Sequence, residues 1–197
     1  GSTVTFWYAG QDPNYAAEPF GVYVIANGTA SDELGHFTAS NTYQQGSVDI
    51  SAYAGQTVQV AFRHYGVTDM FRLNLDLVEV SGGGSTPNTP VPPTENPNTP
   101  EPGTATGWGF ETDPFAEGWT IRDDDGDGYN WEWMEGSGSD YNVYEGTHCM
   151  ASASYQNSAF GGGTALNPDN WLISPAFTAG STVTFWYAGQ DPNYAAE

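Results

Sequence analysis

The sequence predicts an all-β protein, an antiparallel β-sandwich of the jelly-roll type. Short runs of β-branched and aromatic residues recur along the chain, and some alternate strictly between apolar and polar positions. Gly, Pro and Asn-Pro separate these runs where turns are expected. No segment sustains the 3.6-residue period of an amphipathic helix. About nine or ten short strands account for the pattern, and a jelly roll places the first and last of them side by side.

The strand pattern is clearest in residues 72–80, which read RLNLDLVEV and place leucine at every second position from 73 to 77. That spacing is the period of a half-buried strand. TVTFWY at 3–8 and GVYVIA at 21–26 are rich in β-branched and aromatic residues, and TVQVAFRH at 57–64 alternates. The shorter strand candidates are residues 119–121, 129–134, 148–155 and 171–174.

The two ends of the sequence carry the same 18 residues. GSTVTFWYAGQDPNYAAE occurs at 1–18 and again at 180–197. Identity over this length indicates a tandem repeat with a period of 179 residues. We therefore expect neither end of the sequence to be a natural terminus, and we expect the protein to be a string of near-identical domains.

One segment cannot join a core. Residues 82–106 contain seven prolines and six threonines and almost no apolar side chain, which is typical of an extended, semi-rigid linker. We interpret residues 1–81 as the C-terminal half of one β-sandwich repeat and residues 107–197 as the N-terminal half of the next. On this interpretation the two halves belong to domains that are adjacent in space. Exchange of strands between these neighbouring domains would be an extension of the interpretation.

Acidic residues far outnumber basic ones. The 197 residues include 24 Asp and Glu, 3 Arg and no Lys, which gives a formal net charge of −21. Such a chain repels phosphate backbones and anionic lipid heads, so we expect no nucleic-acid partner. No run reaches the ~18 apolar residues of a membrane span, so no membrane insertion is expected. The many aromatic residues predict a secreted or cell-surface β-rich module.

Four aspartates within five residues mark the strongest candidate site. Residues 123–128 read DDDGDG, with Asp at alternate positions and Gly closing the turn, as in the opening of a calcium loop. The twelfth position, where an EF-hand has Glu, is Met134, so other acids must complete the shell. The candidate ligands are Asp123, Asp125, Asp127, the carbonyl of Tyr129, Asp169 and, after it, Asp140. The alternative is an acidic surface turn without an ion.

A second, weaker metal site is predicted from Glu111 and Asp76. Glu111 lies near the start of one domain, and Asp76 lies in the last predicted strand. A jelly roll makes those strands neighbours, so the two acids could hold a structural metal ion. The equally acceptable alternative is a pair of exposed acids on neighbouring strands.

The chain contains no arrangement typical of a catalytic site. Its histidines are His36, His64 and His148, and neither an HExxH nor a GxSxG motif occurs. The single cysteine, Cys149, is expected to be a buried thiol, with a bridge between repeats as the alternative. Paired glycosidase acids are not excluded by sequence, but each acid cluster is better explained as metal ligands or a solvated loop. We predict that the protein is not an enzyme.

Some residues are candidates for contact with glycans or for carrying them. Trp133 and Tyr141 lie near the acidic loop and are candidate glycan contacts, although core packing is the expectation for most of the tryptophans. Asn27 begins the only N-glycosylation sequon, at an expected hairpin turn. The linker threonines lie among prolines, as in O-glycosylated stalks, although an unmodified linker is equally compatible. These threonines are Thr86, Thr89, Thr94, Thr99 and Thr104.

Five motifs in order resemble the cleaved-adhesin domain of bacterial haemagglutinins and gingipain-type surface proteins. They are GWTIRDDDGDGYNW (118–131), ASASY (151–155), NPDNWLISP (167–175), TFWYAGQDPNYAAE (5–18) and VAFRHYGVTDMFRLNLDLVEV (60–80). The resemblance implies a jelly-roll sandwich with bound calcium, an extracellular location and adhesive or structural work without catalysis. It also implies that Asp123, Asp125 and Asp127 form the metal loop, and that Glu111 and Asp76 tie the first and last strands through an ion.

These observations lead to one main hypothesis and two alternatives. The main hypothesis is a non-enzymatic extracellular structural protein whose calcium-stabilised repeats assemble with neighbouring copies into a filament or surface coat and carry or bind glycans. The first alternative is a multivalent adhesin that binds glycans or host proteins, in which repetition raises avidity. The second is an appendage of a secreted enzyme.

Overall fold

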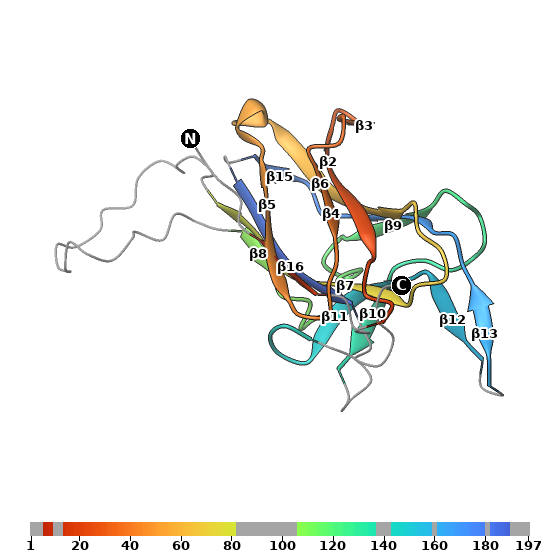
Figure 1. Ribbon diagram of the computed structural model, residues 1–197. Coiled ribbons are helices and arrows are strands. Elements are labelled where there is room, and N and C mark those ends of the chain that lie inside the picture. The colour runs from red at the N-terminus through yellow and green to blue at the C-terminus, as the bar shows by residue number, and fades with distance from the viewer. Residues whose placement is uncertain are drawn as a thin grey trace.

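The computed structural model describes residues 6–9, 14–81, 106–136, 143–158, 161–179 and 182–189. These residues form two seven-stranded sheets, one separate two-stranded hairpin and a single turn of 3-10 helix, η1 (Ser51–Tyr53). Figure 1 shows the two sheets stacked face to face, and the separate hairpin projects from one end of the stack. The predicted all-β sandwich is therefore confirmed.

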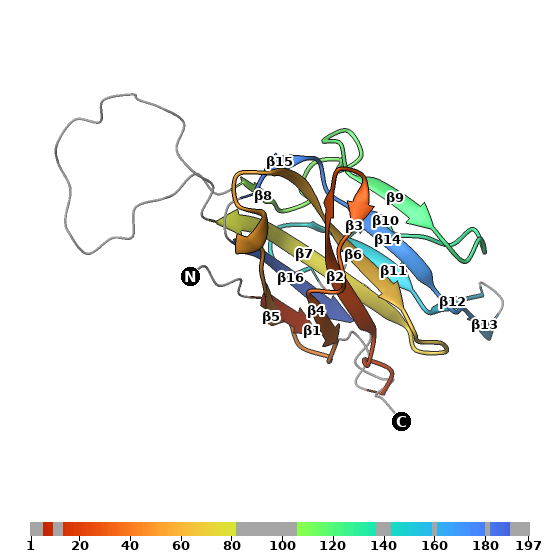
Figure 2. The same cartoon turned by 90° about the horizontal axis from the view of Figure 1, so that it is seen from above.

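The first sheet has the strand order β1-β5-β16-β7-β11-β10, with β8 pairing β7. Its strands are β1 (Phe6–Ala9), β5 (Gln44–Asp49), β7 (Arg72–Ser81), β8 (Thr106–Trp108), β10 (Glu132–Glu135), β11 (His148–Ala153) and β16 (Thr182–Gly189). The long strand β7 is central, because β16 pairs with one of its edges and β11 with the other. Figure 2 shows β16, β7 and β11 running side by side beneath the second sheet.

The second sheet has the strand order β3-β2-β6-β14-β9, with β4 pairing β2 and β15 pairing β6. Its strands are β2 (Pro19–Ala26), β3 (Thr29–Ala30), β4 (Gly35–Thr38), β6 (Thr57–Tyr65), β9 (Thr120–Asp123), β14 (Asp169–Ile173) and β15 (Phe177–Thr178). The separate hairpin consists of β12 (Tyr155–Asn157) and β13 (Gly163–Ala165). The pairings in this sheet and in the hairpin are all antiparallel.

Most of the predicted segments coincide with these strands. The expected runs at 21–26, 57–64 and 72–80 lie in β2, β6 and β7, and the shorter ones overlap β9, β10, β11 and β14. The run at 3–8 overlaps β1, and its first three residues lie outside the described residues. Strand β16 carries the second copy of the run at 3–8. Strands β3, β4, β5, β8, β12, β13 and β15 were not predicted as separate strands, because they are two to six residues long and mostly polar or glycine-containing. The predicted linker boundary at residue 106 is wrong by one residue, since Thr106 begins β8 and pairs with Val80.

Aromatic side chains fill the space between the sheets. Phe20 of β2 meets Tyr187 of β16 edge-to-face at 4.2 Å between ring centroids, and Phe62 of β6 meets Phe185 of β16 at 4.3 Å. All four rings are fully buried. Each pair joins strands from opposite sheets, so the aromatic residues of the repeated segment lie at the centre of the core. At roughly 1.5–3 kcal/mol for each large buried side chain, they stabilise the sandwich strongly.

The two copies of the repeated segment pair with each other. β1 runs parallel to β16, and each residue lies opposite its own duplicate, from Phe6 opposite Phe185 to Ala9 opposite Ala188. Of the two copies, β16 pairs with the central strand β7 and β1 does not. The copy that follows Ala179 therefore takes the core position.

The two segments on either side of the linker complete one sandwich in this chain. β6 pairs with β14, and β7 lies between β16 and β11, so both sheets combine strands from 14–81 and 106–189. This differs from the expectation that the two halves lie in adjacent domains. The reason is physical: β6 and β7 supply the buried central strands that β14, β11 and β16 otherwise lack. The assignment of the segments to two repeats of a longer protein stays a prediction, and the linker residues 82–105 lie outside the described residues.

Candidate metal sites

The loop after β9 gathers three carboxylates. Oxygens of Asp123, Asp125 and Asp127 all lie within 4.8 Å of one another. The loop turns sharply at Gly126 and Gly128, whose φ angles are +73° and +84°, in the left-handed region that glycine adopts at low cost. The alternating aspartates thereby point to one side of a tight turn, as the sequence pattern predicted.

Backbone amides hold these carboxylates in place. Asp123 accepts hydrogen bonds from the N–H groups of Gly126 (2.6 Å) and Gly128 (3.1 Å), and the bond from Gly126 is the main cause that lowers the pKa of Asp123. Asp125 accepts from the N–H groups of Asp127 (3.0 Å) and Asp169 (2.6 Å). Burial nevertheless raises the pKa of Asp125 above its ordinary value. The loop is thus preset, and three carboxylates at this spacing fit a hard divalent cation such as Ca²⁺.

Asp169 supports the loop through its backbone, and its carboxylate lies elsewhere. Both of its carboxylate oxygens accept hydrogen bonds from Arg63, each at 2.7 Å. Its N–H donates to Asp125, and its carbonyl accepts from the N–H of Asp124 at 2.9 Å. The structure therefore does not bring the Asp169 carboxylate into the cluster, because a bidentate arginine pair already holds it. Asp140 lies outside the described residues.

Tyr129 follows the loop directly and is exposed. Its N–H donates to Asp127 at 2.8 Å, which fixes the peptide that leads out of the turn. This is the position from which the sequence analysis expected a carbonyl ligand. Arg122 pairs with Asp124 at 2.7 Å on the outer side and stacks on Trp171 at 4.3 Å, so the nearby cations bind the two acids outside the three-carboxylate cluster.

The carboxylates of Asp76 and Glu111 accept hydrogen bonds from the same short loop, residues 143–148. Asp76 accepts from the N–H groups of Tyr144 (2.9 Å) and Glu145 (3.2 Å). Glu111 accepts from the N–H groups of Thr147 (2.9 Å) and His148 (3.0 Å). Four amides of one loop therefore serve two carboxylates that are 35 residues apart in sequence. As predicted, the strands beside them are neighbours, since Val78 of β7 pairs with Trp108 of β8.

The two acids differ in their exposure. The side chain of Asp76 is fully buried, and burial raises its pKa to about 7, with the charge of Glu111 adding to the shift. Glu111 is exposed, and its backbone hydrogen bonds outweigh the effect of its partial burial and lower its pKa. A buried carboxylate beside a second acid is unfavourable unless a cation neutralises it. The donor set, two carboxylates beside a polar loop, fits a hard cation.

The backbone around this acid pair is sharply bent. Leu77, next to Asp76, has φ +44°, and Phe110, next to Glu111, has φ +56°. Residues other than glycine seldom adopt this region, and each such residue costs of order 1–3 kcal/mol. Gly146 sits between the two pairs of donor amides at φ +75°, and a Cβ there would lie 2.2 Å from the Glu111 carboxyl carbon. These backbone bends direct both carboxylates toward the 143–148 loop. The position of Gly146 in that loop has no room for a side chain.

The candidate glycan residues fall in different surroundings. Trp133 is only partly exposed: its indole N–H donates to the carbonyl of Phe110 at 2.7 Å, and its ring stacks on His148 at 4.6 Å. Tyr141 and the linker threonines lie outside the described residues.

Asn27 is exposed at the β2–β3 turn with φ +52°, followed by Gly28 at +78°, so the predicted hairpin turn is confirmed. Cys149 is buried in β11 and forms no disulfide within the described residues.

The sequence did not predict a buried polar network that crosses the core. His64 of β6 lies 3.0 Å from Glu18 and 2.9 Å from the hydroxyl of Ser152 in β11, and Ser154 donates to Glu18 at 2.8 Å. All four side chains are fully buried. The serine, histidine and carboxylate are in the order of a hydrolase triad, but no face of the network reaches solvent, so it cannot meet a substrate. Its role is to link the two sheets, and only tertiary contact could reveal it.

Comparison with known proteins agrees with the fold and the motifs. The model of the Cleaved Adhesin Domain matches residues 1–40, 35–80 and 104–197. Hemagglutinin A of Porphyromonas gingivalis is 33% identical over 216 aligned residues, which cover 97% of this chain and 7% of hemagglutinin A. Lys-gingipain and gingipain R1 of P. gingivalis strain ATCC 33277 are each 34% identical over 214 residues, covering 97% of this chain and 11% of each relative.

The chain thus spans about a tenth or less of the length of these relatives. No solved structure matches the chain. Within the described residues, no helix has the length and apolar character needed to cross a membrane. The matching family model covers both segments beside the linker and describes an adhesin domain, not a protease domain. The chain therefore belongs to the cleaved adhesin domain family.

Proposed function

We propose that this chain is a binding module of a secreted or cell-surface adhesin, stabilised by calcium and repeated along a longer protein. The adhesin role is supported by the match of both segments to an adhesin family. The repeat is supported by the identical 18 residues at 1–18 and 180–197. The alignments to hemagglutinin A and the gingipains cover 97% of the chain. They therefore include parts of both segments in chain order.

Calcium is the proposed ligand of both acidic sites. At the first site Asp123, Asp125 and Asp127 supply carboxylate oxygens, and the Tyr129 carbonyl is the proposed fourth ligand. At the second site Asp76 and Glu111 would hold the ion between strand β7 and the segment after β8. When bound, calcium neutralises carboxylates that repel one another and ties chain segments together. The first ion would fix the β9–β10 loop, and the second would secure the 143–148 loop against the sheet edge.

Thermal unfolding with and without chelator tests the calcium proposal. Free calcium at 100 times its dissociation constant stabilises a one-site protein by about 2.7 kcal/mol, and at roughly 2–4 °C per kcal/mol for this size the melting temperature should rise by about 5–10 °C. Asp125→Asn should remove part of the rise and Asp76→Asn another part. Asp32→Asn, which alters an exposed acid outside both sites, is the control and should keep the whole rise. An unchanged melting temperature on calcium addition would overturn the proposal.

Repetition gives the adhesin role its physical basis. Linking weak sites along one chain makes the second binding event intramolecular and raises avidity by a factor of about 10²–10⁴. A protein with three successive periods should therefore agglutinate erythrocytes at far lower concentration than the 197-residue chain. Equal titres, or no agglutination by either protein, would contradict the adhesin role. The net charge of −21 supports partners other than nucleic acid and anionic membranes.

Assembly into a filament or surface coat is the second candidate. The parallel pairing of β1 with its own copy β16 favours it, since a duplicated strand offers neighbouring copies a matching sheet edge. The closure of both segments into one sandwich means that assembly does not require strand exchange. Sedimentation of the three-period protein with and without calcium tests this candidate. A monomer at all concentrations in calcium would exclude filament formation.

A further inference from the structure

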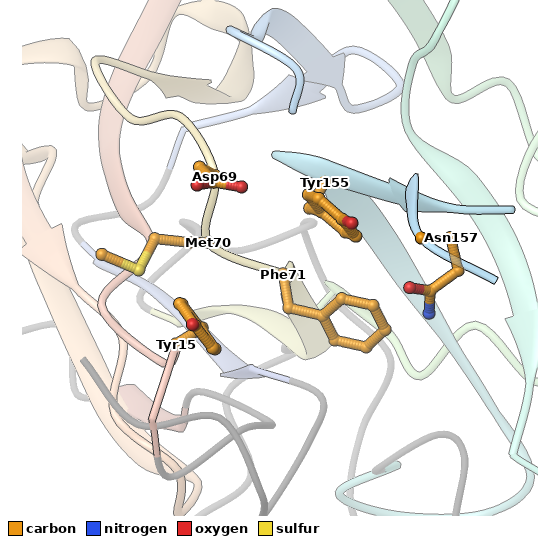
Figure 3. Close-up of a pocket in the computed structure, with 7 residues that line it drawn as sticks. Tyr15, Asp69, Met70, Phe71, Tyr155 and Asn157 are labelled. Atoms are coloured by element: carbon orange, nitrogen blue, oxygen red, sulfur yellow. The ribbon is translucent and has the colours of Figure 1, made fainter. Parts of the chain in front are cut away.

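A pocket outside both acidic sites lies between the hairpin β12–β13 and the loop that joins β6 to β7. Its volume is about 360 Å³, near the lower end of the ~300–1,000 Å³ typical of small-molecule sites. Its lining includes Tyr15, Asp69, Met70, Phe71, Tyr155 and Asn157. Figure 3 shows the aromatic rings of Tyr15, Phe71 and Tyr155 around a shared space, with the polar ends of Asp69 and Asn157 close by.

The pocket walls come from three separate parts of the chain. Tyr15 precedes β2, Asp69 and Phe71 lie between β6 and β7, and Tyr155 begins β12. Each part belongs to one of the sequence motifs that resemble the family: TFWYAGQDPNYAAE, VAFRHYGVTDMFRLNLDLVEV and ASASY. The sequence showed the motifs but not their meeting point, because only the fold brings positions 15, 71 and 155 together.

Backbone hydrogen bonds fix two of the walls to each other. The N–H of Asp69 donates to the carbonyl of Ser154 at 3.2 Å, and the carbonyl of Phe71 accepts from the N–H groups of Ser154 (3.0 Å) and Tyr155 (3.3 Å). Gly163 leaves room for the Tyr155 ring, since a Cβ there would lie 2.6 Å from it. The pocket is therefore preformed, and a ligand would not have to order it on binding.

The chemistry of the lining matches a sugar. A pyranose has an apolar C–H face and a rim of hydroxyl groups. Tyr15, Phe71 and Tyr155 supply flat apolar surface for the face, while the Asp69 carboxylate accepts hydrogen bonds from hydroxyls and the Asn157 amide both donates and accepts. Asp69 and Asn157 are exposed and the three rings are half-buried, which leaves the polar groups accessible from solvent.

The negative charge of the chain and of the pocket favours neutral sugars over anionic ones. The chain carries a net charge of −21, and Asp69 places a carboxylate inside the pocket. Arg72, next to Phe71 in sequence, is held by Glu132 (3.4 Å) and Gln156 (3.2 Å). Anionic sugars would therefore meet repulsion from the lining and from the surrounding field.

We propose that this pocket binds neutral saccharide units, one sugar ring stacking against Tyr155 and Phe71 while Asp69 and Asn157 hold its hydroxyls. The proposal names the ligand class of the adhesin role proposed above and rests on that role for its biological purpose. Binding itself is a property of the 197-residue chain and can be measured on it alone.

The test is binding of the 197-residue chain to an array of neutral and anionic glycans, followed by titration of the best neutral disaccharide by calorimetry. Tyr155→Ala and Phe71→Ala should each weaken binding about tenfold, because each removes one stacking surface. Phe115→Ala is the matched control, since it removes an exposed aromatic ring outside the pocket, and it should bind like the unaltered chain. Absence of any neutral glycan among the ligands, or equal binding by all these variants, overturns the proposal.

Asp69→Asn provides a variant that keeps the fold. Asp69 has φ +57°, and asparagine tolerates this conformation at least as well as aspartate. The substitution should weaken neutral-sugar binding severalfold and should raise the relative binding of sialylated glycans, because it removes the charge from the pocket. An unaltered ratio of neutral to sialylated binding would contradict the role given to Asp69.

Erythrocyte agglutination separates this proposal from the adhesin role. If three-period proteins with Tyr155→Ala in every period still agglutinate, the adhesin role stands and the pocket is refuted as its site. If the unaltered pocket binds neutral sugars but the three-period protein does not agglutinate, the pocket assignment is supported and the adhesin role fails.

Discussion

Removal of His64 from the core should be among the most damaging single changes to this fold. His64 and Glu18 are both fully buried, 3.0 Å apart, and Ser152 and Ser154 complete their hydrogen bonds. His64→Ala would leave the Glu18 carboxylate with the Ser154 hydroxyl as its one remaining side-chain donor among the described contacts. Breaking a buried pair in this way costs about 3–5 kcal/mol, a large part of the about 5–15 kcal/mol that stabilises a typical domain.

Urea unfolding in calcium measures this cost, and a double-mutant cycle assigns it. His64→Leu combined with Glu18→Leu removes both polar partners, so no charge is left buried and the double variant should lose less than the two single variants together, by about 2–3 kcal/mol. The loss should not depend on salt, because buried pairs are hardly screened. Asp124→Asn, which breaks an exposed pair with Arg122, should cost less than about 1 kcal/mol. Additive single losses, or a loss below 1 kcal/mol for His64→Ala, would refute the reasoning.

Three further predictions concern the acidic sites. With calcium chelated, the free energy of unfolding should fall as pH rises from 4 through 7: burial raises the pKa of Asp76 to about 7, so the folded state disfavours the ionised form by up to about 4 kcal/mol. Urea titrations across pH check this, and Asp76→Asn should abolish the fall. Gly146→Ala should lower the free energy of unfolding by about 2 kcal/mol and weaken calcium stabilisation, because the added Cβ would collide with the Glu111 carboxylate. Gly55→Ala is the control: Gly55 has a similar φ angle but open space around it, so this substitution should cost only the backbone strain. Asp125→Asn should weaken calcium binding in a competition titration against a fluorescent chelator, whereas Asp32→Asn should leave the affinity unchanged.

The sequence by itself determined the fold class and the first candidate site. The alternation in residues 57–64 and the β-branched and aromatic run in 21–26 depend on local periodicity, which survives in the strands β6 and β2. The alternation predicted for residues 72–80 does not survive in β7: Asp76 is fully buried and Leu77 is only partly buried, because the backbone bends at Leu77, where φ is +44°. The DDDGDG segment is also local: its carboxylates converge because neighbouring aspartates and two glycines at positive φ fold back on themselves. Turn chemistry placed Asn27 at a hairpin for the same reason.

Only the tertiary structure decided which distant residues meet. Arg63 takes the Asp169 carboxylate away from the calcium loop, and Glu18 finds His64 and Ser154 across the core. The spacing of residues in the sequence predicts neither contact, because the partners are up to 136 residues apart. The same holds for the pocket at Tyr15, Phe71 and Tyr155. The closure of two segments into one sandwich depends on burial of central strands, a property of the whole molecule that no local pattern contains.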